Sequence, residues 1–431
     1  MEQFYPQLGE NLYRHTLPNG LKILVNRRPG FAKYHAYLAV DYGSIHTDFV
    51  MDGTEYKAPG GVAHYLEHKM FDLPGNRDVS EEFAVLGASA NAFTSYDMTA
   101  YLFSCTEHFE RCLELLLEFV CTPYFTQESV TKEQGIIGQE IDMNLDSADT
   151  RVFENLMGQM YEKHPIRIPI LGTQESIADI TEQTLYDCHR AFYHPGNMIL
   201  CIVGDVDGKT VADIARRMTP DTPAPRVEHT DRWQEKMCVA ESHSLEQMEI
   251  SMPMFQIGFK AEPLGKGEAA IRQEIVGDLA AEALLGESSR LYQRLYEQGI
   301  IDSSFGGGYE TVEGMSMLTI GGDSDEPQAV LDAILEQAKI LIAEGIPEED
   351  FLRMKRSAMG RRLRDLDSFD STCFRLCAYE FSDFDYFRFP SVYADITEQE
   401  LREFLKRVVT GERCAMSVIE PTTEEDDYES Q

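Results

Sequence analysis

Two stretches decide the fold of this chain: GGVAHYLEHKMF at residues 60–71 and SANAFTSYDMTAYLFSC at residues 89–105. The first carries apolar residues at helical spacing behind a Gly-Gly turn and predicts a helix. The second alternates polar and apolar residues and predicts a pair of strands. Upstream, alternation at residues 21–28 and 34–44 predicts two more strands, and HFERCLELLLEFV at residues 108–120 predicts a strongly periodic helix.

The order of these predicted elements returns in the second half of the chain. The first half continues with a predicted helix at residues 129–146 and closes with a buried strand at residues 198–206. The predicted strands and helices of the second half follow in a matching order, at residues 256–262, 271–286, 314–322, 329–345, 350–367, 400–409 and 414–420. GGGYE at residues 306–310 is interpreted as a turn, and it lacks the Lys-Ser/Thr pair of a phosphate-binding loop.

The repeated order predicts an α+β chain of two structurally similar domains in tandem, each an antiparallel-rich sheet with helices packed on one face. A length of 431 residues fits two domains of roughly 200 residues each. The proline-rich segment TPDTPAPRV at residues 219–227 is typical of a linker and places the junction. We therefore predict an N-terminal domain at residues 1–222, a homologous C-terminal domain at 228–421, and a disordered acidic tail at 422–431.

Charge and cysteine usage restrict the class of protein. A formal net charge of −36 disfavours nucleic acid as a partner, because phosphate repels a polyanion. The sequence has no apolar run long enough to span a bilayer and no stretch typical of a secretory signal, so no membrane partner is expected. Nine scattered cysteines, several inside apolar runs, are typical of buried free thiols in a reducing compartment. The expected location is cytoplasmic.

The predicted helix at residues 60–71 carries two histidines and a glutamate in a metal-binding pattern. His64 and His68 are four residues apart and therefore lie on one face, about one turn apart. That spacing lets two imidazoles bind one tetrahedral zinc ion. Glu67 lies on nearly the same face and can reach a metal-bound water without ligating the metal, in the inverted order H-x-x-E-H. A solvated helix face with two histidines is the alternative for this pattern alone.

The predicted helix at residues 129–146 offers the third protein ligand that a catalytic zinc needs. Glu133 and Glu140 are seven residues apart and share a face, and the apolar residues Ile136, Ile137 and Ile141 would pack the helix inward. A carboxylate beside an apolar stripe is costly unless it is paired or bound to a metal. Glu140 as a ligand and Glu133 as its support would remove that cost. Two surface glutamates are the alternative that the residues alone leave open.

Longer segments around these residues carry a family resemblance. HYLEH (64–68) is followed, 72 residues after its last histidine, by the glutamate that ends KEQGIIGQE (132–140). GASANAFTSYDMTAY (87–101), HPIRIPILGTQESI (164–177) and YHPGNMILCIVGDV (193–206) are three further blocks. Together they resemble the pitrilysin/insulinase family of inverted zinc peptidases, strongly in the first half of the chain and more weakly beyond it. The length is that of a half-size member.

The resemblance implies a zinc-dependent metalloendopeptidase that binds one Zn²⁺ per chain. Its metal ligands are then His64, His68 and Glu140, by position in the family motif. Glu67 is implied as the general base, and Glu133 as the catalytic carboxylate that supports the site.

The resemblance also implies where the peptide substrate binds. In the family, the substrate adds a strand to an exposed sheet edge, where main-chain hydrogen bonds give affinity with little sequence choice. That edge is expected here at Asn91, Ala92 and Phe93.

One segment departs from the family pattern. Active full-length members carry an Arg and a Tyr that bind the carbonyl side of the scissile peptide, and this chain reads SSRLYQRLYEQGIIDSSF at residues 288–305 in their place. The Arg position falls on Tyr296 and the Tyr position near Asp302. Arg290 and Arg294 are nearby but match other positions of the motif.

Two interpretations follow from the missing pair. A homologous subunit that carries the Arg and Tyr completes the site in a heterodimer, with a homodimer as the variant of this arrangement. Alternatively, the chain is a catalytically silent binding or scaffold subunit of the same family, acting in protein modification related to elongation factor P. The intact H-x-x-E-H motif favours the first interpretation.

Overall fold

The computed structural model describes residues 1–75, 77–229, 233 and 235–422. The chain divides into two compact units, and each unit draws on both halves of the sequence. Unit 1 consists of Met1–Ile141, Ile168–Arg232 and Arg361–Phe389, and unit 2 of Asp142–Arg167, Trp233–Gly360 and Pro390–Gln431. The predicted domains at 1–222 and 228–421 are continuous segments and stay a prediction. Of the predicted tail at 422–431, residues 423–431 lie outside the described residues.

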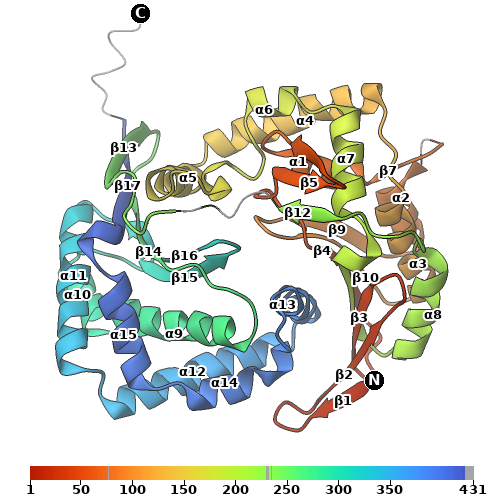
Figure 1. Cartoon of the computed structure of the whole chain (residues 1–431). Helices are drawn as coiled ribbons and strands as arrows, with labels where there is room; N and C mark the ends of the chain where they lie inside the picture. The colour runs from red at the N-terminus through yellow and green to blue at the C-terminus, as the bar shows by residue number, and fades with distance from the viewer. Residues whose placement is uncertain (76, 230–232, 234, 423–431) are drawn as a thin grey trace, which may run out of the picture. The chain divides into compact units, whose positions relative to one another are not determined.

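Unit 1 is built on a seven-stranded sheet (Figure 1). Its order is β1 (Glu2–Tyr5), β2 (Glu10–Thr16), β3 (Lys22–Arg27), β11 (Met198–Gly204), β4 (Tyr34–Val40), β10 (Thr99–Cys105) and β9 (Ser89–Thr94). The β3–β11 pair is parallel and the other pairs are antiparallel. Every residue of β11 is buried, which explains its continuous apolar sequence. The strand β9 is an edge.

The remaining elements of unit 1 are helices and two small sheets. The helices are α1 (Val62–Lys69), α2 (Val79–Val85), α3 (Phe109–Cys121), α4 (Gln127–Leu145, which continues into unit 2), α6 (Gln174–Ala178), α7 (Glu182–Phe192), α8 (Gly208–Met218) and α13 (Phe369–Phe381). The small sheets comprise β5 (Asp48–Met51), β6 (Thr54–Lys57) and β12 (Val227–His229), and β7 (Asp72–Leu73) with β8 (Arg77–Asp78).

The two faces of the unit 1 sheet meet different helices, because side chains alternate along a strand. Ala36 and Leu38 of β4 belong to the apolar core together with residues of α1 and α3. Their neighbours His35 and Tyr37 point the other way and hydrogen-bond to Asp370 of α13, at 3.2 and 2.6 Å. The α13 helix, from the second half of the sequence, thus covers part of the second face.

Unit 2 repeats this architecture with a five-stranded sheet. Its order is β13 (His243–Met248), β17 (Cys414–Pro421), β14 (Met254–Ala261), β16 (Met315–Asp323) and β15 (Gly306–Val312). Its helices are α5 (Ala148–Met160), α9 (Glu268–Leu285), α10 (Arg290–Glu297), α11 (Pro327–Glu344), α12 (Glu348–Asp365, which continues into unit 1), α14 (Phe389–Asp395) and α15 (Glu398–Val408). Here α5, from the first half of the sequence, lies against the sheet, where Gly258 faces Leu156 and Met160.

The predicted fold class is confirmed, since both units are antiparallel-rich sheets covered by helices. One local prediction is wrong: residues 306–310 are not a turn but the start of the edge strand β15. Gly307 is required there, because a Cβ would lie 2.1 Å from the Thr319 carbonyl oxygen of β16. The middle glycine of the three therefore marks a close strand contact in this chain and not a chain reversal.

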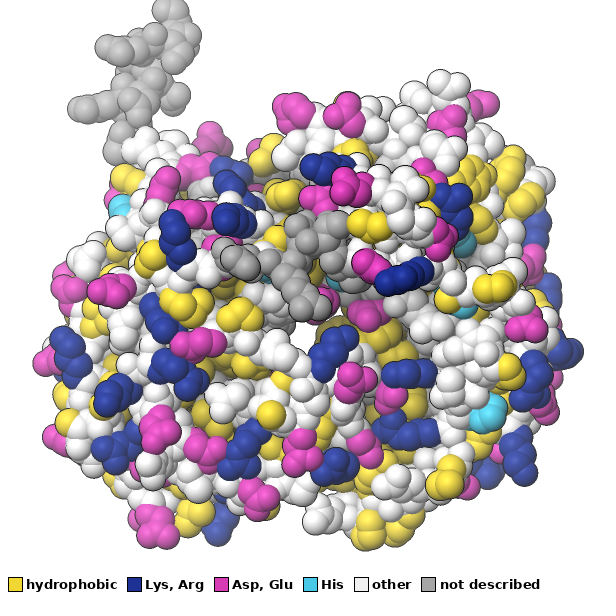
Figure 2. All heavy atoms as spheres, viewed as in Figure 1, with side chains coloured by type: hydrophobic (Ala, Val, Ile, Leu, Met, Phe, Trp, Pro, Cys, Tyr) yellow, Lys and Arg dark blue, Asp and Glu magenta, His cyan; other side chains and the backbone are white. Residues whose placement is uncertain are grey.

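On the face that Figure 2 shows, basic and acidic side chains are interspersed. Every helix in the described part of the chain is too short or too polar to cross a lipid bilayer.

Candidate metal centre

The start of helix α1 is set by two glycines. Gly61 caps the helix with φ of 90°, and a Cβ on this residue would lie 2.4 Å from the Leu171 carbonyl oxygen. Only glycine combines that backbone conformation with so close an approach. The helix that follows is buried along most of its length. It brings His64 and His68 together on one face, as predicted, with ring centroids 4.6 Å apart.

Glu140 of α4 meets both histidines. Its Oε1 lies 3.7 Å from His64 Nε2, and its Oε2 lies 3.8 Å from His68 Nε2. One ligand atom from each of the three residues lies within 4.8 Å of the others. Ligand atoms around a tetrahedral zinc are about 3.3 Å apart, since each bond is about 2.0–2.1 Å. The donor set of two imidazoles and a carboxylate therefore fits a small divalent cation with an open fourth position.

His64 is held in the neutral form that a metal ligand requires. It is 7% exposed, and burial, with a smaller contribution from His68, lowers the pKa of His64 from 6.5 to about 4. Its Nδ1 is buried without a hydrogen-bond partner among the described residues. A neutral imidazole whose Nε2 faces a carboxylate and a second imidazole is poised for coordination.

Glu133 lies behind His68 and not among the ligand atoms. Its Oε1 is 3.0 Å from His68 Nδ1, a hydrogen bond that raises the pKa of His68 and leaves Nε2 toward Glu140. Burial opposes the charge on Glu133, but the bonds to His68 and Lys69 outweigh it and the pKa of Glu133 is lowered. Lys69 is 1% exposed and pairs with Glu133 Oε2 at 3.6 Å and with Asp72. This is how a carboxylate orients a metal-binding histidine.

Glu67 lies near His68 and Glu140. It is 8% exposed, and burial raises its pKa above the usual value. Its Oε2 accepts a 2.7 Å hydrogen bond from Thr94 Oγ1. A carboxylate with a raised pKa beside a cluster of metal ligands is suited to accept a proton from water.

The predicted substrate residues lie on the edge strand β9. The Ala92 N–H donates to Asn91 Oδ1 at 2.9 Å. Because Ser95 N–H bonds Met98 O and bonded pairs alternate along an antiparallel ladder, Ala92 and Tyr101 form a non-bonded pair, and the Ala92 N–H faces away from β10. Phe93 is half-buried between the rings of Tyr37 and Phe374, each 6.0 Å away. The strand thus offers an edge donor for a further strand, next to the residue that bonds Glu67.

The two positions at which the sequence resemblance expects the Arg/Tyr pair make local contacts within unit 2. Tyr296 is 54% exposed and stacks on Tyr292 with centroids 5.7 Å apart. Asp302 accepts from the Ser304 amide at 2.7 Å and from its hydroxyl at 2.6 Å, and these bonds lower the pKa of Asp302. Asp302 therefore stays ionised and caps its own turn.

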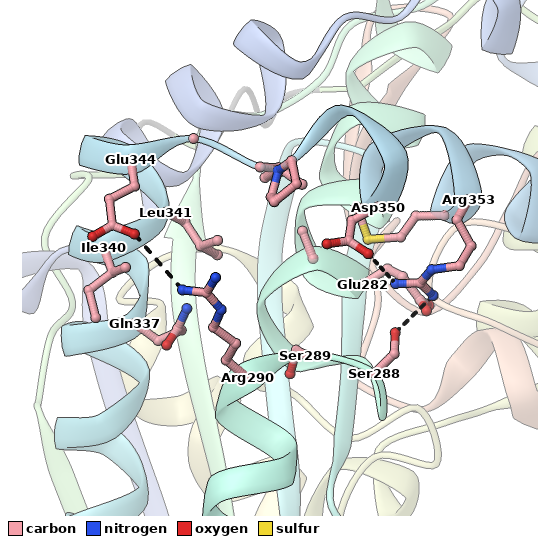
Figure 3. Close-up of a pocket in the computed structure, with 15 residues that line it drawn as sticks. Glu282, Ser288, Ser289, Arg290, Gln337, Ile340, Leu341, Glu344, Asp350 and Arg353 are labelled. Carbon is pink, nitrogen blue, oxygen red and sulfur yellow. Dashed lines mark hydrogen bonds and ion pairs between the residues drawn. The ribbon is translucent and has the colours of Figure 1, made fainter.

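Neither neighbouring arginine is free of ion pairs. Arg290 lines the pocket of Figure 3, where it points toward Glu344 at 3.9 Å, while Arg353 contacts Asp350 and Ser288. Arg294 lies 3.7 Å from Glu336.

The structure brings together five predicted residues, His64, Glu67, His68, Glu133 and Glu140. Two residues of the site have no predicted role: Thr94, which lies in the block at residues 87–101, and Lys69. A lysine between a histidine and apolar Met-Phe signals nothing by itself, because its burial depends on Glu133, 64 residues away.

Comparison with known proteins gives a consistent result. The family model described as "Insulinase (Peptidase family M16)" matches residues 28–174, and "Peptidase M16 inactive domain" matches residues 179–358. The "uncharacterized zinc protease YmfH" of Bacillus subtilis is 37% identical over 427 residues, 97% of this chain and 98% of that protein. The mitochondrial-processing peptidase subunit beta of Caenorhabditis elegans is 23% identical over 94% of this chain and 89% of that protein.

Solved structures agree on the fold. A putative M16-like peptidase from Alicyclobacillus acidocaldarius has a TM-score of 0.93 at 31% identity and covers 97% of this chain and 100% of that one. A protease from Helicobacter pylori has a TM-score of 0.82 at 18% identity, covers 95% and 99% respectively, and shares the fold. The Bacillus relative is thus matched almost end to end, both M16 domains are present, and the His-His-Glu cluster lies in the first of them. This chain therefore belongs to the insulinase (M16) family of peptidases.

Proposed function

We propose that this chain is a zinc metalloendopeptidase of one Zn²⁺ per chain, held by His64, His68 and Glu140. The observation that carries the proposal is the meeting of these three donors from helices α1 and α4 within 4.8 Å. The name "zinc protease" of the Bacillus relative supports the choice of zinc over other divalent ions.

The residues around the cluster supply the proton chemistry. A bound zinc ion lowers the pKa of a coordinated water toward about 7. With that metal bound, Glu67 would accept a proton on Oε1, since Thr94 donates its hydrogen bond to Oε2. The same carboxyl would return the proton to the leaving amine. Glu133 keeps His68 Nδ1 occupied, so that Nε2 is the nitrogen offered to the metal.

The proposed substrate is an extended peptide that pairs with the edge of β9 at Asn91, Ala92 and Phe93. The Ala92 N–H, which faces away from β10 and bonds the neighbouring Asn91 side chain, supports this position. Main-chain pairing holds many sequences with similar affinity. The proposal thus favours a peptidase that cleaves many unfolded chains over one that cleaves a single specific sequence.

The proposed active form has two subunits, and this chain is the one that carries zinc. The support is the absence of the Arg/Tyr pair, with Tyr296 stacked on Tyr292 and Asp302 capping a turn. A homologous subunit with that pair completes a heterodimer; a homodimer is the variant. The same observation favours the second candidate, a silent binding subunit acting in protein modification related to elongation factor P.

We also propose a cytoplasmic location. All nine cysteines are free and seven of them are buried, as expected in a reducing compartment.

The test is Glu67→Gln, assayed with a homologous partner present. We expect one zinc per chain to remain while hydrolysis of an unfolded peptide falls by about 10² or more, since the proton acceptor is lost. The control is Glu128→Gln, an exposed change at the start of α4, which should keep both the bound zinc and the hydrolytic activity. Normal turnover by Glu67→Gln would remove Glu67 as the base, and an inactive wild type with its partner would favour the silent subunit.

A further inference from the structure

Thr94 is the last residue of the edge strand β9, and its side chain reaches the proposed base. Its Oγ1 donates to Glu67 Oε2 over 2.7 Å. Glu67 is 8% exposed, and among the described residues this is the one hydrogen bond that its carboxylate makes. A hydroxyl bond to an ionised oxygen is roughly twice as strong as a neutral one. Thr94 therefore holds one oxygen of Glu67 and leaves Oε1 open.

The backbone beside Thr94 is anchored on both sides. In the ladder, Thr94 lies opposite Thr99 of β10. In the turn that follows, Ser95 O accepts from the Ser44 amide at 3.1 Å, and Tyr96 O accepts from the Ile45 amide at 3.0 Å. The position of the Thr94 Cα is thus set by hydrogen bonds on each side of it.

A close approach secures the same turn. A Cβ on Gly43 would lie 2.5 Å from the Tyr96 carbonyl, so the two segments touch at a distance that only glycine permits. Threonine adds its own stiffness, because a β-branched side chain has restricted rotation about χ1. The direction of the Thr94 hydroxyl is therefore fixed by the fold and not by Glu67.

Without a hydrogen bond to hold it, Glu67 would be able to coordinate the metal instead of acting as a base. It is adjacent in sequence to His68, and a carboxylate free to turn beside a divalent cation is itself a good ligand. Once bound as a fourth ligand, it would close the open position and could no longer accept a proton. A hydrogen-bond donor that holds Oε2 away from the metal therefore preserves the ability of Glu67 to accept a proton.

We propose that Thr94 is a positioning residue that keeps Glu67 a base and prevents it from becoming a fourth metal ligand. The proposal rests on the proposed function and deepens it: the strand whose edge takes the peptide also orients the base. The step itself is unchanged, with the water proton passing to Glu67 Oε1 and Thr94 keeping its own proton.

Two variants at residue 94 and a matched control test this. Thr94→Val removes the hydroxyl at nearly constant shape, and Thr94→Ser restores it. Thr99→Val, directly opposite in β10, loses a buried hydroxyl bond of 2.9 Å to Tyr42 O but does not touch Glu67. Zinc content, melting temperature, kcat and KM are measured for each with the partner subunit present.

For Thr94→Val we expect kcat to fall about tenfold with KM within about twofold and zinc retained, because orientation and not binding is lost. Thr94→Ser should recover kcat to within about threefold, and Thr99→Val should lower the melting temperature with kcat nearly unchanged. Equal impairment of Thr94→Val and Thr94→Ser, or a kcat of Thr94→Val within twofold of wild type, would overturn the proposal.

Crystal structures of the zinc-loaded wild type and Thr94→Val give a readout that does not depend on turnover. The wild type should keep Thr94 on Glu67 Oε2, and in Thr94→Val the carboxylate should turn onto the zinc or occupy two orientations. An unchanged Glu67 in Thr94→Val would overturn the proposal. A wild type inactive with every partner contradicts the proposed function, and these structures still decide the role of Thr94.

Discussion

In this centre, the protonation state of each histidine depends on its burial and on the groups beside it. His64 is neutral because its burial lowers its pKa, while His68 has its pKa raised by a hydrogen bond to Glu133, 65 residues away in helix α4. Glu140 is the most exposed of the three proposed ligands, with 41% of its side chain accessible. The ligand set thus combines two preorganised imidazoles with one accessible carboxylate, which suits a metal that enters from solvent.

His64→Ala and Glu140→Gln should each abolish tight zinc binding. Each removes one of three protein ligands, and loss of a ligand should exceed the roughly 10–100-fold that loss of an outer hydrogen bond costs. Metal analysis after dialysis and competition with a chelator measure the effect. Glu128→Gln on the same helix should bind like the wild type. Wild-type stoichiometry in either ligand variant would contradict the ligand assignment.

His189→Gln should remove a pH-dependent part of the stability. Burial lowers the pKa of His189 from 6.5 to about 4, with its Nε2 3.1 Å from Val120 O. Because the folded pKa is depressed, the unfolded chain takes up the proton first, and stability is lost as pH falls from 6.5 to 4. A shift of this size is worth roughly 3 kcal/mol.

Urea unfolding of wild type and His189→Gln between pH 7 and pH 4 measures that difference. The wild type should lose roughly 3 kcal/mol more than the variant, whose amide can keep the bond to Val120. His64 titrates in both proteins and cancels in the comparison. Parallel stability curves would show that His189 does not contribute.

Among the elements, helix α1 depends most on its entry. The Gly61 backbone, at φ of 90° and in contact with Leu171, determines where the first turn begins and therefore where His64 lies. The edge strand β9 is the second element on which the site depends, through Ala92 at its edge and Thr94 at its end.

Gly61→Ala should destabilise the protein by more than about 2 kcal/mol and weaken zinc binding, since it adds a clash to an unfavourable φ. Gly53→Ala is the matched control: φ is 84° there, but a Cβ meets nothing within 4 Å. It should cost only about 1–2 kcal/mol and leave zinc affinity unchanged. Equal effects of the two changes in urea unfolding would show that the contact with Leu171 is unimportant.

Ala92→Pro should lower kcat/KM for an unfolded peptide about two- to tenfold, the worth of one hydrogen bond of roughly 0.5–1.5 kcal/mol. Proline removes the edge N–H, and edge strands tolerate it. Ala92→Gly keeps the N–H and should keep most of the activity. Zinc content and melting temperature verify that the fold survives. Unchanged kcat/KM in Ala92→Pro would place the peptide elsewhere.

At the scale of the whole molecule, we expect the isolated chain to be a weak peptidase. Loss of one oxyanion donor typically costs about 2.7–4 kcal/mol, or 10²–10³ in kcat, and Tyr296 and Asp302 supply no cation. Co-expression with a homologous subunit that carries the Arg/Tyr pair should give a stable 1:1 complex with at least about 100-fold higher turnover.

Size-exclusion chromatography and peptide cleavage by each subunit alone and together measure this. Full activity of the isolated monomer would refute the divided site. A fully active homodimer would do so as well, and loss of that activity in Arg290→Ala or Arg294→Ala would identify the residue that replaces the missing pair.

The amino-acid sequence alone determined the features that depend on near neighbours along the chain. Helical spacing placed His64 and His68 on one face, and strand alternation with the repeated order of elements predicted two α+β halves. These patterns are readable because 3.6- and 2-residue periods relate residues only a few positions apart.

The tertiary structure alone decided what depends on distant parts of the chain. It buried Lys69 against Glu133, placed Thr94 on Glu67, and sent α13 and α5 to sheets of the other half of the sequence. Residues 306–312 form a strand because they pair with β16, and at Gly307 the carbonyl of Thr319 approaches too closely for a side chain. Packing selects among such arrangements because space must be filled and buried charges must be paired. The local periodicity of the sequence does not specify which distant residue supplies the partner of a buried charge.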